Sequence, residues 1–174
     1  MRDFNDIARM YVDDLFRIAY TYVQNAQLAE DIVQDVFLKA FERQEQFRGD
    51  SNYKTYLVRM TINRSKDILK SWPYRNFVLK NTVLNLLHFE QSAEDVVLSK
   101  NRHSEIAEKI LTLKPKYREV LYFYYYHDYD VKALAKLLGI SENTIKTRLV
   151  RARKQLKDKM KDVREVFIDD TQID

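Results

Sequence analysis

Residues 131–157 read VKALAKLLGISENTIKTRLVRARKQLK, and this stretch decides the fold of the C-terminal part of the chain. Its first residues carry apolar side chains at the spacing i, i+3, i+4 and i+7, which predicts a helix with one inward face. The inward residues are Val131, Leu134, Ala135 and Leu138. Gly139 tolerates positive φ just past a helix end, Ile140 fills the corner, and Ser141 offers an oxygen that caps the next helix. Two helices joined in this way are typical of a helix-turn-helix unit.

The second helix of this stretch has an apolar side and a basic side. The apolar side, which we expect to pack on the first helix, consists of Ile145, Leu149, Ala152 and Leu156. The other side holds Asn143, Thr144, Lys146, Thr147, Arg148, Arg151, Arg153 and Lys154. Residues 146–161 contain eight cations and one acidic residue, Asp158. A solvated basic helix is the alternative, but the capped turn before it favours a helix that enters a DNA groove.

Composition restricts the fold and the possible chemistry. The 174 residues include only two Gly and two Pro, which favours an all-α fold. Cys is absent and the three His are far apart, so we expect no disulfide, metal or cofactor site. Asp3 and Asp6 stand where a signal peptide would need cations, and no apolar run approaches the ~20 residues of a membrane span. We therefore expect a cytoplasmic protein without enzymatic activity or a small-molecule substrate.

The N-terminal part shows helical periodicity in three segments, at about residues 3–23, 27–46 and 52–70. Gln24 and Asn25 interrupt the first, and a turn at 47–51 precedes the third. In the second segment we expect an inward side of Ile32, Val33, Val36, Phe37, Ala40 and Phe41. Another side of that segment is acidic with an apolar centre, and consists of Asp31, Gln34, Asp35 and Leu38.

The charge is unevenly distributed along the chain. Residues 1–50 contain ten acidic and six basic residues, whereas residues 51–75 contain six basic residues and one acidic residue. Polar and basic residues of the third helix fall on one stripe: Thr55, Arg59, Asn63, Lys66 and Lys70. Because the helix-turn-helix is a second basic segment, the pattern predicts two contacts with nucleic acid.

The chain is expected to form two small helical domains, an N-terminal helical bundle at 1–70 and a C-terminal helix-turn-helix domain at 99–162, with a linker at 71–98. Pro73 disfavours helix before it, although apolar residues in the linker suggest that part of it docks or forms a short helix. Pro115 opens a helix of the C-terminal domain. The aromatic run 122–126 is expected to support the helix-turn-helix, and residues 163–174 form an acidic tail.

Three segments together resemble the extracytoplasmic-function (ECF) sigma factors, the smallest group of bacterial sigma-70-type initiation factors. They are LFRIAYTYVQN at 15–25, AEDIVQDVFLKAFERQEQFRGDSNYKTYLVRMTINRSKDIL at 29–69, and LKPKYREVLYFYYYHDYDVKALAKLLGISENTIKTRLVRARKQL at 113–156. The order of the segments matches the family, and the resemblance covers almost the whole chain. It implies a protein that binds RNA polymerase and directs it to promoters.

The resemblance implies roles for three groups of residues. The AEDIVQDVF helix would dock on the coiled coil of the polymerase β′ subunit through Asp31, Gln34, Asp35 and Leu38; a solvated acidic face is the alternative. The minus-10 element would be melted and read by Lys54, Tyr56, Arg59, Asn63 and Lys66. The minus-35 element would be contacted by Asn143, Thr144, Lys146, Thr147, Arg148 and Arg151.

Some details of these roles stay open. Tyr56 stands where the family usually has Trp, so its stacking on a base would be weaker. The alternative is that Tyr53 and Tyr56 are ordinary packing aromatics without a role in DNA binding. Arg153 and Lys154 are expected to serve phosphates or solvent. The sequence does not say which helix-turn-helix residues contact bases.

The resemblance also implies partners and leaves rivals. The partners are the polymerase core enzyme, through β′ and β, promoter DNA, and an anti-sigma factor, which in this family is often membrane-anchored. A stand-alone helix-turn-helix regulator is the alternative, but it leaves the acidic face around Asp35 and the basic helix around Asn63 without a role. An enzyme is the weaker rival, since Asp31 and Asp35 share one helix with no second catalytic group.

Overall fold

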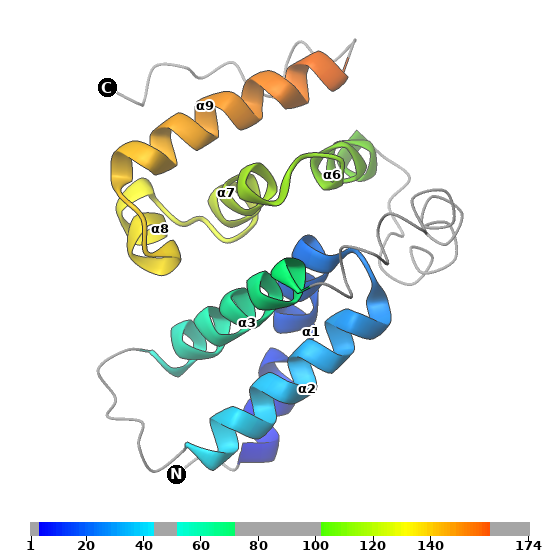
Figure 1. The fold of residues 1–174 in the computed structure, drawn as a ribbon, viewed down its shortest axis with the longest axis vertical. Helices are drawn as coiled ribbons and strands as arrows, with labels where there is room; N and C mark the ends of the chain where they lie inside the picture. The colour runs from blue at the N-terminus through cyan, green and yellow to red at the C-terminus, as the bar shows by residue number, and fades with distance from the viewer. Residues whose placement is uncertain (1–3, 44–51, 72–101, 161–174) are drawn as a thin grey trace. The chain divides into compact units, whose positions relative to one another are not determined.

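The computed structural model describes residues 4–43, 52–71 and 102–160, and the regular elements in these ranges are α-helices (Figure 1). The chain divides into two compact units, residues 1–98 and residues 99–174. The expected all-α architecture of two helical domains is therefore confirmed. The turn at 47–51, the linker beyond Ser71 and the acidic tail lie outside the described residues. Within the described ranges, each helix is too short or too polar to cross a membrane.

The first unit is a three-helix bundle of α1 (Phe4–Val23), α2 (Ala26–Glu42) and α3 (Tyr53–Lys70), in which each helix packs on the other two. Its hydrophobic core consists of Leu15, Ile18, Ala19, Tyr22, Val23, Ala29, Ile32, Val33, Val36, Ala40, Leu57, Val58 and Ile62. Burying each large apolar side chain stabilises the unit by about 1.5–3 kcal/mol. The bundle thereby fixes which sides of α2 and α3 face the solvent.

Local residues set the helix ends of this unit, and the predicted break at Gln24 and Asn25 is confirmed. Gln24 adopts φ 50° after the end of α1, and the Asn25 side chain accepts a hydrogen bond from the Leu28 N–H at 2.9 Å. The Asn52 side chain caps α3 in the same way, because it accepts a hydrogen bond from the Lys54 N–H at 3.0 Å. These caps satisfy helix N–H groups that have no partner within their own helix.

The predicted burial of Phe41 is wrong. Its side chain is 58% exposed, although its ring meets the Phe4 ring at a centroid distance of 5.1 Å. Successive helix residues turn by about 100°, so Phe41 lies beyond the edge of the inward face that contains Val36 and Ala40. Phe37, also expected inside, is half-buried. The acidic side of α2 therefore carries a second exposed apolar residue, three positions after Leu38.

The second unit consists of α6 (Arg102–Leu111), α7 (Pro115–Tyr126), α8 (Val131–Leu138) and α9 (Glu142–Lys159), and α9 packs on the other three helices. Its hydrophobic core contains Ile110, Leu113, Tyr117, Val120, Leu121, Phe123, Leu134, Leu137, Ile145, Leu149, Ala152, Leu156 and Met160. The four residues predicted for the inner side of α9 are fully buried. In α8, however, Leu137 takes the buried place expected for Leu138, which is half-buried.

The turn between α8 and α9 has the expected chemistry. Gly139 adopts φ 68°, its N–H donates to the Ala135 carbonyl at 2.9 Å, and the Ile140 N–H donates to the same oxygen at 3.2 Å. Ser141 Oγ accepts a hydrogen bond from the Thr144 N–H at 3.1 Å. A Cβ on Gly139 would meet no atom within 4 Å, so the left-handed backbone, rather than space, requires glycine here. The helix-turn-helix prediction is confirmed.

Candidate nucleic-acid interface

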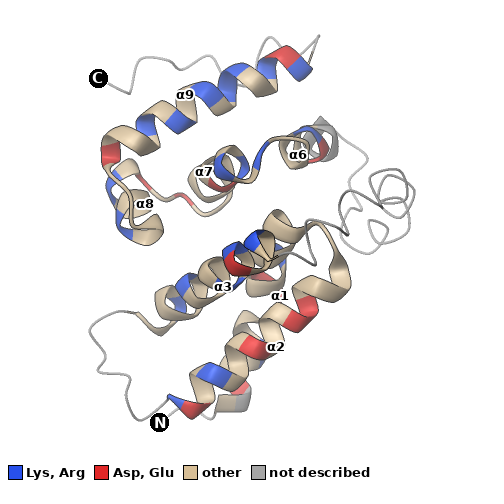
Figure 2. Cartoon of the chain, viewed as in Figure 1, with Lys and Arg blue, Asp and Glu red and all other residues tan. Residues whose placement is uncertain are grey.

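The two units expose helix faces of opposite charge. Figure 2 shows that basic residues dominate α9, whereas acidic residues are more frequent along α2. The cations of α9 are Lys146, Arg148, Arg151, Arg153, Lys154, Lys157 and Lys159. Arg151, Lys154, Lys157 and Lys159 are exposed. A helix face with this charge density attracts a polyanion such as DNA.

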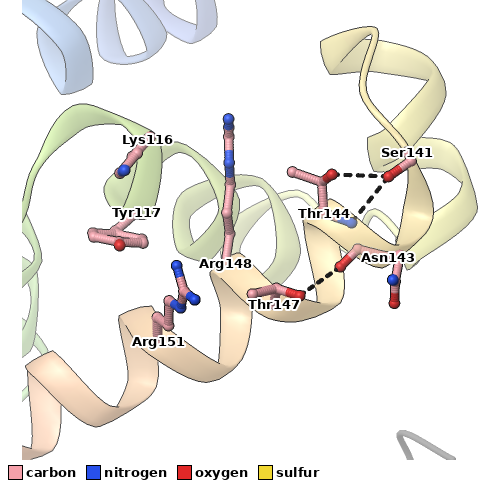
Figure 3. Close-up of a pocket in the computed structure, with 8 residues that line it drawn as sticks. All are labelled: Lys116, Tyr117, Ser141, Asn143, Thr144, Thr147, Arg148 and Arg151. Atoms are coloured by element: carbon pink, nitrogen blue, oxygen red, sulfur yellow. Dashed lines mark hydrogen bonds between the residues drawn. The ribbon is translucent and has the colours of Figure 1, made fainter.

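An open concavity of about 250 Å³ lies between the N-terminal half of α9 and the first turn of α7 (Figure 3). Its lining consists of Lys116, Tyr117, Ser141, Asn143, Thr144, Thr147, Arg148 and Arg151. Five of the six residues predicted for the minus-35 element therefore line one concavity. Lys146, the sixth, is half-buried and does not line it.

Hydrogen bonds order the start of α9 beside this concavity. Thr144 Oγ1 lies 2.8 Å from Ser141 Oγ, and Thr147 Oγ1 donates to the Asn143 carbonyl at 2.8 Å. Both threonine hydroxyls are thus held against their own helix. Asn143 and Thr147 are exposed, so they remain accessible to a groove or a phosphate.

Arg148 is tied to the interior of the unit. Its Nη1 donates to Glu119 Oε1 of α7 at 2.8 Å; the Glu119 side chain is 2% exposed and that of Arg148 is 25% exposed. A carboxylate this deeply buried is very costly unless it is paired. Arg148 was predicted to contact the minus-35 element, and one edge of its guanidinium additionally joins α9 to α7.

Sequence reasoning missed Glu119, Lys116 and Tyr117 as neighbours of the residues predicted for the minus-35 element. Glu119 carried a usable signal, because it interrupts the apolar side of α7 next to Val120 and Leu121. A charge in such a position requires a cationic partner from another helix. Lys116 is an exposed lysine in the first turn of α7 and carried no comparable signal.

Arg153 contacts aromatic side chains rather than lying free in solvent. Its Nε donates to the Tyr125 hydroxyl at 2.9 Å, and its guanidinium lies 5.7 Å and 5.8 Å from the ring centroids of Tyr124 and Tyr125. The expectation that Arg153 serves phosphates or solvent stays a prediction, and these contacts give its half-buried side chain an additional structural role. Phe123 is 1% exposed, so this part of the aromatic run braces α9, as expected.

Four of the predicted minus-10 residues, Tyr56, Arg59, Asn63 and Lys66, fall on one side of α3, whereas Lys54 lies on the side that faces α1. Asn63 is exposed, whereas Lys54, Tyr56, Arg59 and Lys66 are half-buried. Lys54 Nζ lies 2.8 Å from Asp14 Oδ2 of α1, so its charge is already paired. Lys66 Nζ lies 5.9 Å from the centroid of the Tyr22 ring.

Tyr53 and Tyr56 form a tilted aromatic pair at the start of α3. Their ring centroids are 5.9 Å apart and the interplanar angle is 45°. Burial raises the pKa of Tyr53, and the nearby Tyr56 raises that pKa further. Both rings are half-buried, so Tyr56 keeps an accessible portion that a flipped base can stack on.

The acidic side of α2 combines exposed polar and apolar residues. Asp31 and Gln34 are exposed, and Leu38 is 65% exposed. Asp35 Oδ2 lies 3.1 Å from Lys39 Nζ and 2.6 Å from Arg64 Nε of α3. The contact with Arg64 is an ion pair but not a hydrogen bond, because the Nε–H does not point at the carboxylate. Among the described residues, acidic and His side chains form no cluster that could hold a metal ion.

Comparisons with known protein families identify both units. Residues 7–72 match the family Sigma-70 region 2, and residues 103–156 match the family Sigma-70, region 4. The ECF RNA polymerase sigma factor SigW of Bacillus subtilis is 30% identical over 168 residues, which cover 92% of this chain and 90% of that protein. The ECF RNA polymerase sigma factor SigM of the same organism is 27% identical over 158 residues, covering 88% of this chain and 92% of that protein.

Two solved structures have a similar fold. The sigma factor RpoE, crystallised with the anti-sigma factor NepR from Bartonella quintana, has a TM-score of 0.63 at 22% identity, covering 94% of this chain and 100% of that chain. CnrH, in complex with the cytosolic domain of CnrY, has a TM-score of 0.61 at 21% identity, covering 89% of this chain and 85% of that chain. At these identities the similarity supports the fold alone.

Proposed function

The chain belongs to the sigma-70 family as an ECF-type RNA polymerase sigma factor, and from this premise we propose that its two helical units divide promoter recognition between them. One observation carries the proposal. A capped helix-turn-helix presents a basic concavity in one unit, while an acidic helix face with exposed apolar residues lies in the other.

The N-terminal unit, which we assign to residues 1–70, binds the polymerase core enzyme and the minus-10 element. Asp31, Gln34, Asp35 and Leu38 of α2 dock on the coiled coil of β′. Acidic residues around the exposed Leu38 suit a basic helical partner, because charges steer the encounter and the apolar centre is desolvated. Lys54, Tyr56, Arg59, Asn63 and Lys66 of α3 hold the separated strand through its backbone and one stacked base.

The C-terminal unit, which we assign to residues 99–162, positions the enzyme on duplex DNA at the minus-35 element. Asn143, Thr147 and Arg151 are its exposed contact residues, and Thr144 and Lys146 lie beside them. Arg148 contributes through the guanidinium edge that Glu119 does not occupy. Contacts to phosphates set the position of the unit, and contacts to base edges set its sequence preference.

Strand separation in this mechanism is driven by binding, since the sequence has no nucleotide-binding GxxxxGK[ST] loop. Unpairing is offset by contacts to extruded bases and to the polymerase. We assign no catalytic activity to the chain and place its work in the cytoplasm, where promoters and polymerase meet. An anti-sigma factor, membrane-anchored or free, would act by covering the polymerase-binding and DNA-binding faces.

The experiment that tests the proposal compares promoter binding with and without polymerase. A sigma factor of this type should retain a promoter duplex only when core enzyme is present. In an electrophoretic mobility shift assay we therefore expect a specific complex with the reconstituted holoenzyme and none with the protein alone. Tight, sequence-specific binding by the protein alone would instead support the stand-alone regulator.

A further inference from the structure

Lys116 of α7 extends the basic surface of the second unit beyond α9. We propose that the concavity between α7 and α9 seats one phosphate of the DNA backbone, and that Lys116 and Arg151 are its two direct ligands. This inference rests on the proposed function and adds a DNA-binding residue outside the helix-turn-helix.

The side chains that line the concavity converge from two helices. Figure 3 shows Lys116, Tyr117 and Arg151 projecting toward a common space beside Arg148. Lys116 and Arg151 are exposed, so their charged groups are free of the desolvation that burial imposes. Cations that approach a point from two separate elements match an anion placed between them better than a solvated helix face does.

The Tyr117 ring holds the ammonium of Lys116 near this space. Lys116 Nζ lies 5.1 Å from the centroid of the Tyr117 ring, which is a cation–π distance. Tyr117 is itself 7% exposed, so the hydrophobic core of the unit fixes the ring. The lysine therefore has a preferred direction, which reduces the side-chain entropy lost on binding an anion.

The charge balance of the concavity is positive. Its lining contains Lys116, Arg148 and Arg151 and no acidic residue. Glu119, which lies outside the lining, offsets the charge of Arg148, whereas no ion pair of the described residues offsets the charges of Lys116 and Arg151. A phosphodiester, with one negative charge and two exposed oxygens, fits two such donors.

The position of the concavity favours a duplex phosphate over other anions. Its lining includes Asn143, Thr147 and Arg151 of α9, the helix predicted to enter a DNA groove. A helix that enters the major groove is flanked by backbone phosphates, and neighbouring elements commonly contact them. An acidic peptide of an inhibitor would satisfy the same charges, but it would not couple Lys116 to a phosphate at a fixed place in the promoter.

The first test uses the holoenzyme and a promoter duplex at a series of KCl concentrations. We expect Lys116→Ala to weaken binding by about fivefold at low salt, as for an exposed ion pair, and to reduce the slope of log K against log salt by about 0.9, as for one lost phosphate contact. Lys116→Arg should keep both values near wild type. Lys114→Ala removes an exposed lysine that does not line the concavity and serves as the matched control.

The second test locates the phosphate. Neutral methylphosphonate linkages are placed one at a time through the minus-35 region, and each duplex is measured with wild-type and Lys116→Ala holoenzymes. We expect one linkage that weakens the wild type and has little effect on the variant. An unchanged salt slope, or equal effects of every linkage on both proteins, would overturn the assignment of Lys116. Failure of the wild-type holoenzyme to bind the promoter specifically would instead count against the proposed function.

Discussion

The acidic side of α2 and the basic side of α9 each contain a charged residue that is already paired within the protein, but the two pairs differ in burial. Asp35 contacts Arg64 with side-chain exposures of 28% and 42%. Arg148 contacts Glu119 with exposures of 25% and 2%. The acidic partner of the ion pair is therefore partly exposed in the first unit, where it is Asp35, and buried in the second unit, where it is Glu119.

This difference separates residues that are available to a partner from residues that the fold requires. A partly exposed pair contributes ~1 kcal/mol or less, so breaking the Asp35–Arg64 contact would cost little, as the proposed docking on the polymerase requires. Removing the cation from a buried carboxylate leaves a charge without compensation. The family resemblance implies a recognition role for both Asp35 and Arg148, and Arg148 additionally joins α9 to α7 through the buried Glu119.

The largest expected effect is the loss of stability in Arg148→Ala. Because Glu119 would stay buried after losing the Arg148 cation, we expect the free energy of unfolding to fall by about 3 kcal/mol. Urea denaturation followed by circular dichroism measures this change. Arg151→Ala, an exposed residue of the same concavity, is the matched control and should change stability by about 0.5 kcal/mol or less.

A double variant sharpens this prediction. Glu119→Leu combined with Arg148→Met removes both charges and keeps an apolar contact, so stability should return close to wild type. A single Arg148→Ala variant as stable as Arg151→Ala would show that the buried pair does not distinguish the two units.

The next effect concerns the side of α2 that we propose binds the polymerase. Leu38 is 65% exposed, so Leu38→Asp should leave stability nearly unchanged. It should weaken binding to the core enzyme by about 2 kcal/mol, because an apolar anchor at the centre of an interface is replaced by a charge. Fluorescence anisotropy of labelled protein titrated with core enzyme gives the affinity. Val12→Asp changes an exposed apolar residue of α1 and should retain wild-type affinity.

A smaller effect is expected at the turn that orients α9. Gly139 adopts φ 68°, so Gly139→Ala should reduce the free energy of unfolding by about 1–2 kcal/mol. Asn visits this backbone region more readily, so Gly139→Asn should cost less. Thermal denaturation of the two variants compares them directly. Equal stability of Gly139→Ala and wild type would mean that the turn relaxes to another backbone conformation.

The smallest expected effect is on stability when the ion pairs of Asp35 are weakened, in contrast to the large loss expected for Arg148→Ala. Asp35→Asn weakens the partly exposed ion pairs with Lys39 and Arg64, and we expect stability to change by less than about 1 kcal/mol. Increasing salt should reduce the difference in unfolding free energy between Asp35→Asn and the wild type, since salt screens solvent-accessible charges. A loss as large as that of Arg148→Ala would remove the contrast between the two pairs.

Sequence reasoning predicted the features that depend on neighbouring residues. The turn at Gly139 and Ser141 and the apolar side of α9 were predicted correctly, because backbone conformation, capping and helical spacing are local. The break at Gln24 and Asn25 was predicted for the same reason. Most of the predicted minus-35 residues also share one concavity, since they lie on one helix.

The features that sequence reasoning missed depend on contacts between helices. Phe41 is exposed because α1 and α3 cover the side of α2 that contains Val36 and Ala40, and Phe41 lies beyond its edge. Glu119 and Arg148 are 29 positions apart, so their pairing follows from the packing of α7 on α9. The place of Lys116 beside Arg151 likewise depends on that packing.

The most direct test of two separate recognition surfaces is promoter-dependent RNA synthesis by core polymerase with wild-type protein, Asp35→Arg or Arg151→Glu. The wild type should initiate at one defined start. Asp35→Arg should fail to bind the core enzyme, whereas Arg151→Glu should bind it normally but lose initiation at a promoter with a minus-35 element. Absence of promoter-dependent transcripts with the wild type, together with tight duplex binding by the protein alone, would contradict the account.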